Sequence, residues 1–393
     1  MSIRRRRAAA RQEVAGDLRQ SVRELCRRFP ESYWSDLDSK RAYPEEFVKA
    51  MTEARYLAAL IPEKYGGLGL SLTKASIILE EVNRSGGNAQ PAHAQMYVMG
   101  ALLRHGSEEQ KGELLPRIAS GQLRLQAFGV TEPVAGTDTT ALTTTALPRD
   151  GGYVVNGRKI FISRVQHSDL LLLLARTTPI EQVHKKTDGL TMFLVELRQA
   201  ISHGLTVKPI PVMINNETNE LIFDNLEIPA SSLVGEEGKG FSYVLDGMNA
   251  ERILIASECI GDGRWFVEKA VDRAGQREVF GRPIGKNQGI QFPIARAHVG
   301  VEAAELMRTR ASELFDRGEP CGSQANMALL LAAEASWQAA NAAMQTYGGY
   351  GFASSYQIER KFRETRLYQV APISTNLILA HIGEHVLGLP RSY

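Results

Sequence analysis

The stretch Gly151-Gly-Tyr-Val-Val-Asn-Gly-Arg-Lys-Ile-Phe-Ile-Ser163 belongs to the part of this chain, from about residue 126, in which a helical pattern gives way to an extended one. It holds two strand-like runs, 153–155 and 159–162, separated by Asn156-Gly157, a pair typical of tight turns. Similar runs follow at 170–174, 192–197 and 220–223. The turn pairs around them are Asp150-Gly151, Asp188-Gly189 and Asp224-Asn225. This alternation predicts a β domain over 126–239 without crossover helices.

The flanking segments are helical in pattern. Before the β segment, apolar residues recur at three- and four-residue steps, as at Leu72, Ala75, Ile78, Leu79 and Val82. After residue 240 the strands stop, and long helical patterns are broken by short stretches rich in glycine and proline at 281–283, 318–320 and 348–351. We therefore expect an N-terminal helical domain over 1–125, with residues 1–11 frayed, the β domain, and a C-terminal helical domain over 240–393.

Composition excludes several classes of protein. The 46 basic and 44 acidic residues leave a net charge of +2, so no global field favours nucleic acid. Cys26, Cys259 and Cys321 lie too far apart for a disulfide framework or a thiolate metal cage, which suggests a reducing, cytoplasmic location. The longest apolar run, 327–333, is too short to span a membrane. Acidic residues soon follow Arg4-Arg-Arg-Arg7, so we expect no secretion signal.

Two local motifs suggest chemistry only weakly. His381-Ile-Gly-Glu-His385 has the spacing of a zinc site, but no residue that could supply a third ligand follows it, so we expect no metal. Neither glycine cluster, at 66–69 or at 348–351, forms the dinucleotide fingerprint at a strand-to-helix turn. A nicotinamide site is therefore not indicated.

Glu251 is the more informative position. In a helix, Val244, Met248, Ile255 and Cys259 lie on the same face as Glu251, which places a carboxylate inside an apolar stripe. Burial there raises a carboxylate pKa toward neutrality and suits a general base. The alternatives are an ion pair with the following arginine or with another basic group, or a glutamate at the margin of the stripe.

Several motifs, taken in register, resemble the acyl-CoA dehydrogenase family. They are Ile61-Pro-Glu-Lys-Tyr-Gly-Gly-Leu-Gly69, Val130-Thr-Glu-Pro-Val-Ala-Gly-Thr-Asp138, Gly157-Arg-Lys-Ile-Phe-Ile-Ser163, Arg277-Glu-Val-Phe-Gly281, Gln288 and Gln345-Thr-Tyr-Gly-Gly-Tyr-Gly351. The resemblance extends from about residue 44 to 390. It implies an N-terminal helical domain, a middle β-barrel or sandwich domain and a C-terminal four-helix bundle, in the order expected from the residue patterns.

The resemblance also implies noncovalent FAD between the β and C-terminal domains, with acyl-CoA beside the flavin ring. The residues expected near the flavin are Phe128, Val130, Thr131, Phe161, Ile162 and Ser163, with Thr137 near both the cofactor and the CoA thioester. The residues expected to hold the pyrophosphate and adenosine of FAD across a subunit contact are Arg277, Val279, Phe280, Gln288, Gln345 and Gly349. A shared site of this kind implies an oligomer, and we expect a tetramer built from dimers.

The catalytic base departs from the commonest pattern of the family. That pattern places a glutamate before a Gly-Thr pair near the C-terminus, where this chain has Ala371-Pro372 followed by Ile373-Ser374. A minority of members, similar to isovaleryl- and long-chain acyl-CoA dehydrogenases, carry the base on an earlier helix before Arg-Leu. Asn249-Ala-Glu251-Arg-Ile matches that context, so the resemblance implies Glu251 as base, with Asn249 and Arg252 near the substrate.

The expected activity is α,β-dehydrogenation of an acyl-CoA to its trans-2-enoyl-CoA, with electrons passed to an electron-transfer flavoprotein. One alternative is an oxidase or oxygenase of the same fold that uses molecular oxygen. Another is a catalytically silent member that binds acyl-CoA, or nucleic acid through Arg4–Arg7. Arg164, which follows the flavin-facing strand, is expected either to touch a polar acyl group or to form a surface salt bridge.

Overall fold

The computed structural model describes residues 16–391, and the N-terminal residues expected to fray, Arg4–Arg7 among them, lie outside this range. The described chain packs as two compact units. The helical unit contains the residues up to Lys40, Leu70–Ala89 and the chain from Asn249 onward, and the sheet unit contains Arg41–Gly69 and Gln90–Met248. Each unit is therefore assembled from segments that are distant in sequence.

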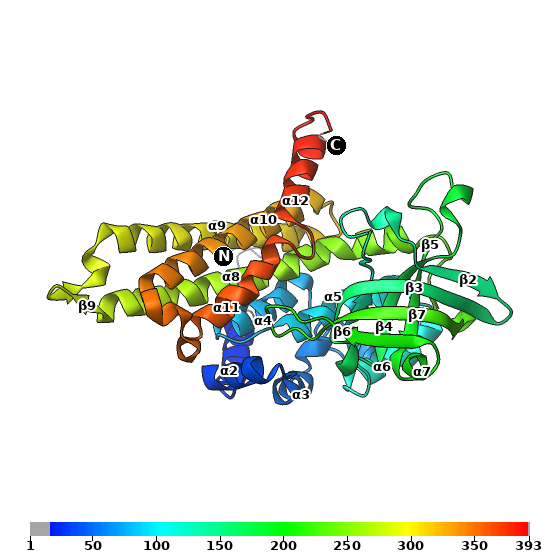
Figure 1. Ribbon diagram of the computed structural model, residues 1–393, viewed down its shortest axis with the longest axis horizontal. Helices are drawn as coiled ribbons and strands as arrows, with labels where there is room; N and C mark the ends of the chain where they lie inside the picture. Colours follow the sequence, from blue (N-terminus) through cyan, green and yellow to red (C-terminus); the bar gives the residue numbers. More distant parts are fainter. Residues whose placement is uncertain (1–15, 392–393) are drawn as a thin grey trace, which may run out of the picture. The chain divides into compact units, whose positions relative to one another are not determined.

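The sheet unit is built on one eight-stranded sheet (Figure 1). Its strands are β1 (Ala127–Gly129), β2 (Thr145–Arg149), β3 (Gly152–Ser163), β4 (Leu170–Arg176), β5 (Leu190–Glu196), β6 (Leu205–Pro209), β7 (Thr218–Pro229) and β8 (Leu233–Val234). They lie in the order β6-β7-β3-β2-β4-β5-β8, with β1 beside β4. Most pairs are antiparallel, whereas β1 and β2 pair with β4 in parallel. The predicted β domain thus exists as a mixed sheet.

Two of the predicted turns are wrong. Asn156-Gly157 lies inside β3 and Asp224-Asn225 lies inside β7, and these two strands pair with each other. The register shifts between Val155 and Gly157, and the backbone N–H of Asn225 donates to Asn156 Oδ1 at 2.8 Å. Asn225 has φ 49° and Gly157 has φ 144°. Residues that favour turns form a β-bulge here, because a bulge needs the same positive backbone angles.

Both faces of the sheet are covered, and β4 shows this directly because all of its residues are buried. Leu171 and Leu173 join a core formed by the sheet itself. Leu170 and Leu172 pack on the opposite face with residues of α5 and α6. The helices of this unit are α3 (Glu45–Glu53), α5 (Gln90–His105), α6 (Glu108–Ala119) and the short α7 (Leu197–Ser202).

The helical unit is built around three long helices, α8, α9 and α10. Its elements are α2 (Glu31–Lys40), α4 (Leu72–Arg84), α8 (Gly240–Gln276, within this unit from Asn249), α9 (Gln288–Asp316), α10 (Gly322–Tyr347), α11 (Ile358–Arg366) and α12 (Thr375–His381). The predicted face of α4 is buried, from Leu72 to Val82. Many of the buried residues of α10 are alanines, which let neighbouring helices approach closely. The order of helical, sheet-rich and helical segments is confirmed.

The prediction that strands stop after residue 240 is wrong in one short segment. The link between α8 and α9 contains a two-stranded ribbon, β9 (Glu278–Val279) paired with β10 (Arg282–Pro283). Phe280, at its tip, has φ 53° and a fully exposed ring. The predicted helix breaks at 281–283, 318–320 and 348–351 are confirmed.

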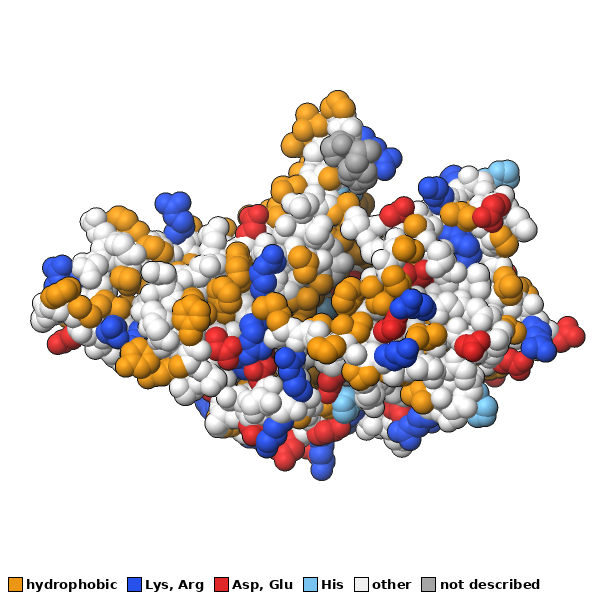
Figure 2. Space-filling model, in the orientation of Figure 1, with side chains coloured by type: hydrophobic (Ala, Val, Ile, Leu, Met, Phe, Trp, Pro, Cys, Tyr) orange, Lys and Arg blue, Asp and Glu red, His pale blue; other side chains and the backbone are white. Residues whose placement is uncertain are grey.

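No helix among residues 16–391 is both long and apolar enough to cross a membrane. On the face shown in Figure 2, basic and acidic side chains lie interspersed rather than gathered by sign. This distribution agrees with the small net charge of the sequence.

Candidate active site

Glu251 lies on α8 in the helical unit and is only 8% exposed. Among the described residues, no hydrogen bond or ion pair reaches its carboxylate. Burial raises the pKa of Glu251 to about 7, although the positive charge of Arg252 acts in the opposite direction. The carboxyl group is therefore poised to exchange a proton near neutral pH.

Arg252 does not form the ion pair with Glu251 that was one alternative reading. Its Nη1 donates instead to Asn249 Oδ1 at 3.0 Å. Its Nε is buried without a hydrogen-bond partner in the described chain. Burial lowers the pKa of the guanidinium. Asn249 and Arg252, two of the three residues expected near the substrate, thus lie together beside Glu251 on one helix.

Phe161, expected to face the flavin, occupies an unusual position in β3. Its φ is 58° and its ring is 59% exposed, whereas the adjacent Ile162 is buried. The pairing of β3 with β7 shifts register between Lys159 and Ile162, which bulges the strand at Phe161. A large aromatic residue held in the left-handed region is strained, and such strain is concentrated at functional sites. Ser163, at the end of the strand, accepts a hydrogen bond from Asn216 Nδ2 at 3.2 Å.

The segment after β1, which contains Val130 and Thr131, is held by a buried ion pair that the sequence did not reveal. Lys159 Nζ lies 3.0 Å from the backbone oxygen of Val130 and 2.9 Å from Glu132 Oε1. The N–H of Ile160 donates to the oxygen of Thr131 at 2.9 Å. These contacts bring Val130 and Thr131 alongside the strand that carries Phe161.

The other residues that were expected near the flavin differ in how exposed they are. Phe128 is partly buried in β1, and its ring packs edge-on against Tyr97 at a centroid distance of 5.7 Å. Thr137 lies on an exposed loop, and no hydrogen bond joins it to the other expected residues.

Arg164 does not form the surface salt bridge that was one of its expected roles, because it is only 6% exposed. Its Nη2 donates to Gln90 Oε1 at 2.9 Å and also to Asn216 Oδ1. Burial and the nearby charge of Arg164 lower the pKa of His93 to about 3, so His93 is neutral at physiological pH. Nothing in the local pattern around Arg164 indicates that this arginine enters the interior.

A pocket of about 620 Å³ opens at the end of the helical unit, between the start of α9 and the end of α10. It is lined by Arg277, Ile284, Asn287, Ile290, Gln345, Thr346, Tyr347, Gly348, Gly349, Tyr350 and Ala353. Three of these, Arg277, Gln345 and Gly349, were expected to hold the pyrophosphate and adenosine of FAD. Val279, Phe280 and Gln288, expected with them, do not line this pocket and are exposed.

The chemistry of this pocket fits a diphosphate. The lining residues include one guanidinium, two carboxamides and no carboxylate. The first turn of α9 forms part of the wall, and a helix N-terminus attracts anions. Gly348 has φ 60°, and a Cβ at Gly349 would meet nothing within 4 Å, so the backbone there is open to a ligand.

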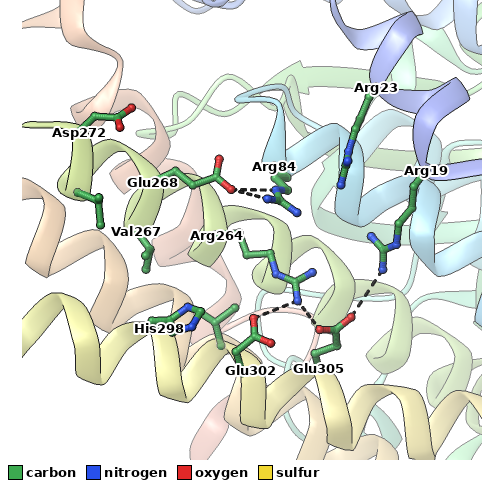
Figure 3. Close-up of a pocket in the computed structure, with 12 residues that line it drawn as sticks. Arg19, Arg23, Arg84, Arg264, Val267, Glu268, Asp272, His298, Glu302 and Glu305 are labelled. Carbon is green, nitrogen blue, oxygen red and sulfur yellow. Dashed lines mark hydrogen bonds and ion pairs between the residues drawn. The ribbon is translucent and has the colours of Figure 1, made fainter. Parts of the chain in front are cut away.

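A second pocket, of about 770 Å³, has a different character (Figure 3). Arg264 pairs with Glu302 and Glu305, and Arg84 pairs with Glu268. Because its guanidiniums are already matched by carboxylates, this pocket offers no unbalanced charge to an anionic cofactor.

Comparison with known proteins gives consistent matches along the chain. Models of the acyl-CoA dehydrogenase N-terminal, middle and C-terminal domains match residues 12–122, 127–226 and 238–387. An acyl-CoA dehydrogenase of Bacillus subtilis is 34% identical over 375 residues, which cover 94% of this chain and 97% of that protein.

Two solved structures are similar over nearly their whole length. A chain in the structure of the electron-transferring flavoprotein of Acidaminococcus fermentans matches with a TM-score of 0.89 and 29% identity, covering 95% of this chain and 97% of that chain. The FAD complex of PigA matches with a TM-score of 0.89 and 26% identity, covering 96% and 98%.

Proposed function

The chain belongs to the acyl-CoA dehydrogenase family, with FAD as its cofactor, and on that premise we propose that it oxidises an acyl-CoA thioester to the trans-2-enoyl-CoA. The observation that carries this proposal is the state of Glu251, a buried carboxylate with a pKa of about 7 and no partner in the described chain. Ala371 and Pro372, at the position of the commoner base, cannot accept a proton. Glu251 is therefore the proposed base.

In the proposed reaction, Glu251 removes the α-proton of the thioester. A carboxylate with a pKa near the working pH combines a deprotonated fraction with adequate basicity. Bound FAD supplies the acceptor for the hydride that leaves the β-carbon. Arg252, held by Asn249, places a positive charge beside the base and keeps the pKa of Glu251 from rising further.

The residues proposed to hold FAD fall into two sets, one in each unit. In the sheet unit they are Phe128, Val130, Thr131, Thr137, Phe161, Ile162 and Ser163, of which Phe161 presents an exposed ring. In the helical unit they are Arg277, Val279, Phe280, Gln288, Gln345 and Gly349 around the diphosphate-compatible pocket. We propose that the second set serves the cofactor of a neighbouring subunit in a homotetramer.

The proposed electron acceptor is an electron-transfer flavoprotein. Similarity to a chain in the structure of such a flavoprotein supports this choice. The proposed location is the cytoplasm, which the three unpaired, buried cysteines support.

The test is anaerobic reduction of the bound flavin by a panel of acyl-CoA thioesters. At least one thioester should bleach the wild-type flavin, and Glu251→Gln should retain FAD but lose bleaching. Glu268→Gln is the matched control, because Glu268 lies on the same helix and pairs with Arg84 on the exposed surface. Bleaching by Glu251→Gln at the wild-type rate would remove Glu251 from the role of base. Stoichiometric hydrogen peroxide during aerobic turnover would instead identify an oxidase.

A further inference from the structure

Two arginines meet a cluster of tyrosines at the end of α8. Arg273 lies in the last turn of this helix, and Arg277 follows directly after it. The Cζ of Arg273 lies 4.7 Å from the ring centroid of Tyr350 and 5.5 Å from that of Tyr347. The Cζ of Arg277 lies 5.9 Å from the same Tyr350 ring. Both guanidiniums therefore contact the aromatic ring of Tyr350.

The two tyrosines belong to the wall of the 620 Å³ pocket. Tyr356 packs edge-on against both, at centroid distances of 5.1 Å from Tyr350 and 6.0 Å from Tyr347. Tyr347 is buried, whereas Tyr350 is 46% exposed. The cluster thus holds the partly exposed ring of Tyr350 in the pocket wall, in contact with Arg273, which does not itself line the pocket.

Neither arginine is neutralised within residues 16–391. No carboxylate forms an ion pair with Arg273 or Arg277, and the Nε of Arg273 is buried without a hydrogen-bond partner. Two guanidiniums one helical turn apart repel each other. The π-faces of the tyrosines offset part of this repulsion, and an anion beside them would offset more.

We infer that Arg273 is a positioning residue for an organic diphosphate: it fixes Tyr350 and supplies a second positive charge, while Arg277 contacts the diphosphate directly. The inference rests on the proposed function, in which the diphosphate is that of FAD. It extends the site by Arg273, Tyr347 and Tyr350, none of which the sequence motifs assigned to the cofactor.

The experiment titrates FAD into the deflavinated full-length chain at several salt concentrations. Arg273→Met keeps the aliphatic stem and removes the charge, and Arg273→Lys keeps the charge. The expected result is an FAD dissociation constant about tenfold higher in Arg273→Met and mostly restored in Arg273→Lys, since a second positive charge near a diphosphate is worth roughly that factor even without direct contact. The dependence of log Kd on log salt should also be shallower in Arg273→Met than in the wild type.

Arg366→Met is the matched control, because Arg366 lies over the ring of Trp337 at 5.4 Å and neither residue lines the pocket. It should leave the FAD dissociation constant and its salt dependence unchanged. An unchanged dissociation constant in Arg273→Met, or an equal loss in the Met and Lys variants with wild-type salt dependence, would overturn the inference. Failure of the wild-type chain to bind FAD would instead refute the cofactor site itself.

Discussion

Lys159 Nζ lies 2.9 Å from Glu132 Oε1, and both side chains are buried. Glu132 also accepts hydrogen bonds from the backbone N–H groups of Thr143 and Thr144, and Lys159 donates to the backbone oxygen of Val130. These interactions hold the pKa of Glu132 at about 2, against the opposing effect of burial. One ion pair therefore ties the segment after β1 to the strand that presents Phe161.

Removing the cation should strongly destabilise the sheet unit. Lys159→Met leaves a buried carboxylate without its counter-charge, and breaking a buried pair in this way costs about 3–5 kcal/mol. Urea unfolding should show a lower free energy of unfolding. Lys208→Met is the control, because Lys208 is exposed on β6 and should change stability by less than about 0.5 kcal/mol. A loss of under about 1 kcal/mol in Lys159→Met would contradict the importance of this pair.

Local pattern predicted the four strands β3, β4, β5 and β7, but it predicted neither the other four strands of the sheet nor how β3 and β7 pair. Asn156-Gly157 and Asp224-Asn225 each carry the residues of a turn, and only their mutual pairing converts them into one bulge. Local sequence does not report a partner that lies almost seventy positions away along the chain. The same limit hid the pairing of Lys159 with Glu132, since nothing at a spacing of 27 residues marks two charges as neighbours.

Replacing Phe161 with glycine should weaken FAD binding while leaving the stability of the protein nearly unchanged. Its φ of 58° is strained for phenylalanine, and glycine adopts this angle freely. Phe161→Gly should therefore leave the free energy of unfolding within about 1 kcal/mol of the wild type, despite the loss of a large side chain. FAD affinity should fall, as measured by flavin fluorescence titration.

Val154→Gly, in the same strand, is the comparison. Val154 has no positive φ, so glycine there brings only flexibility and lost packing, and the variant should be destabilised by about 1 kcal/mol. If Phe161→Gly proved the more destabilised of the two, strain at Phe161 would not be the correct description.

Part of the candidate site follows from the sequence, because helical periodicity alone places Glu251 in an apolar stripe. The burial of Ile255 and Cys259 on that helix agrees with the expected face. Arg164 shows the limit of such reasoning. An arginine is ordinarily exposed, and its burial against Gln90 and Asn216 depends on contacts from distant segments.

The pH dependence of flavin reduction should report Glu251. With a pKa of about 7, the rate should fall about tenfold per pH unit below pH 7 and reach a plateau above it. Arg252 favours the charged carboxylate, so Arg252→Met should move the midpoint to higher pH. Stopped-flow reduction under saturating substrate measures both profiles. Arg310→Met, an exposed change on α9, should leave the midpoint in place. A midpoint that Arg252→Met does not move would show that another group governs the profile.

Ionisation of the buried Glu251 carboxyl should also lower the free energy of unfolding at neutral and higher pH, where the base is active. Its pKa is 4.5 in its ordinary state and about 7 when folded, so the folded state holds this proton more tightly than the unfolded state. Stability from this group is therefore present at pH 4.5 and is lost as the pH rises through 7, by about 3 kcal/mol at most. Glu251→Gln, which cannot ionise, should be more stable than the wild type at pH 8 and nearly equal to it at pH 4.5. Urea unfolding at both pH values measures the difference, with Glu268→Gln expected to track the wild type at each. Equal stability of Glu251→Gln and the wild type at pH 8 would mean that the carboxylate is not desolvated and that its pKa is not raised by burial.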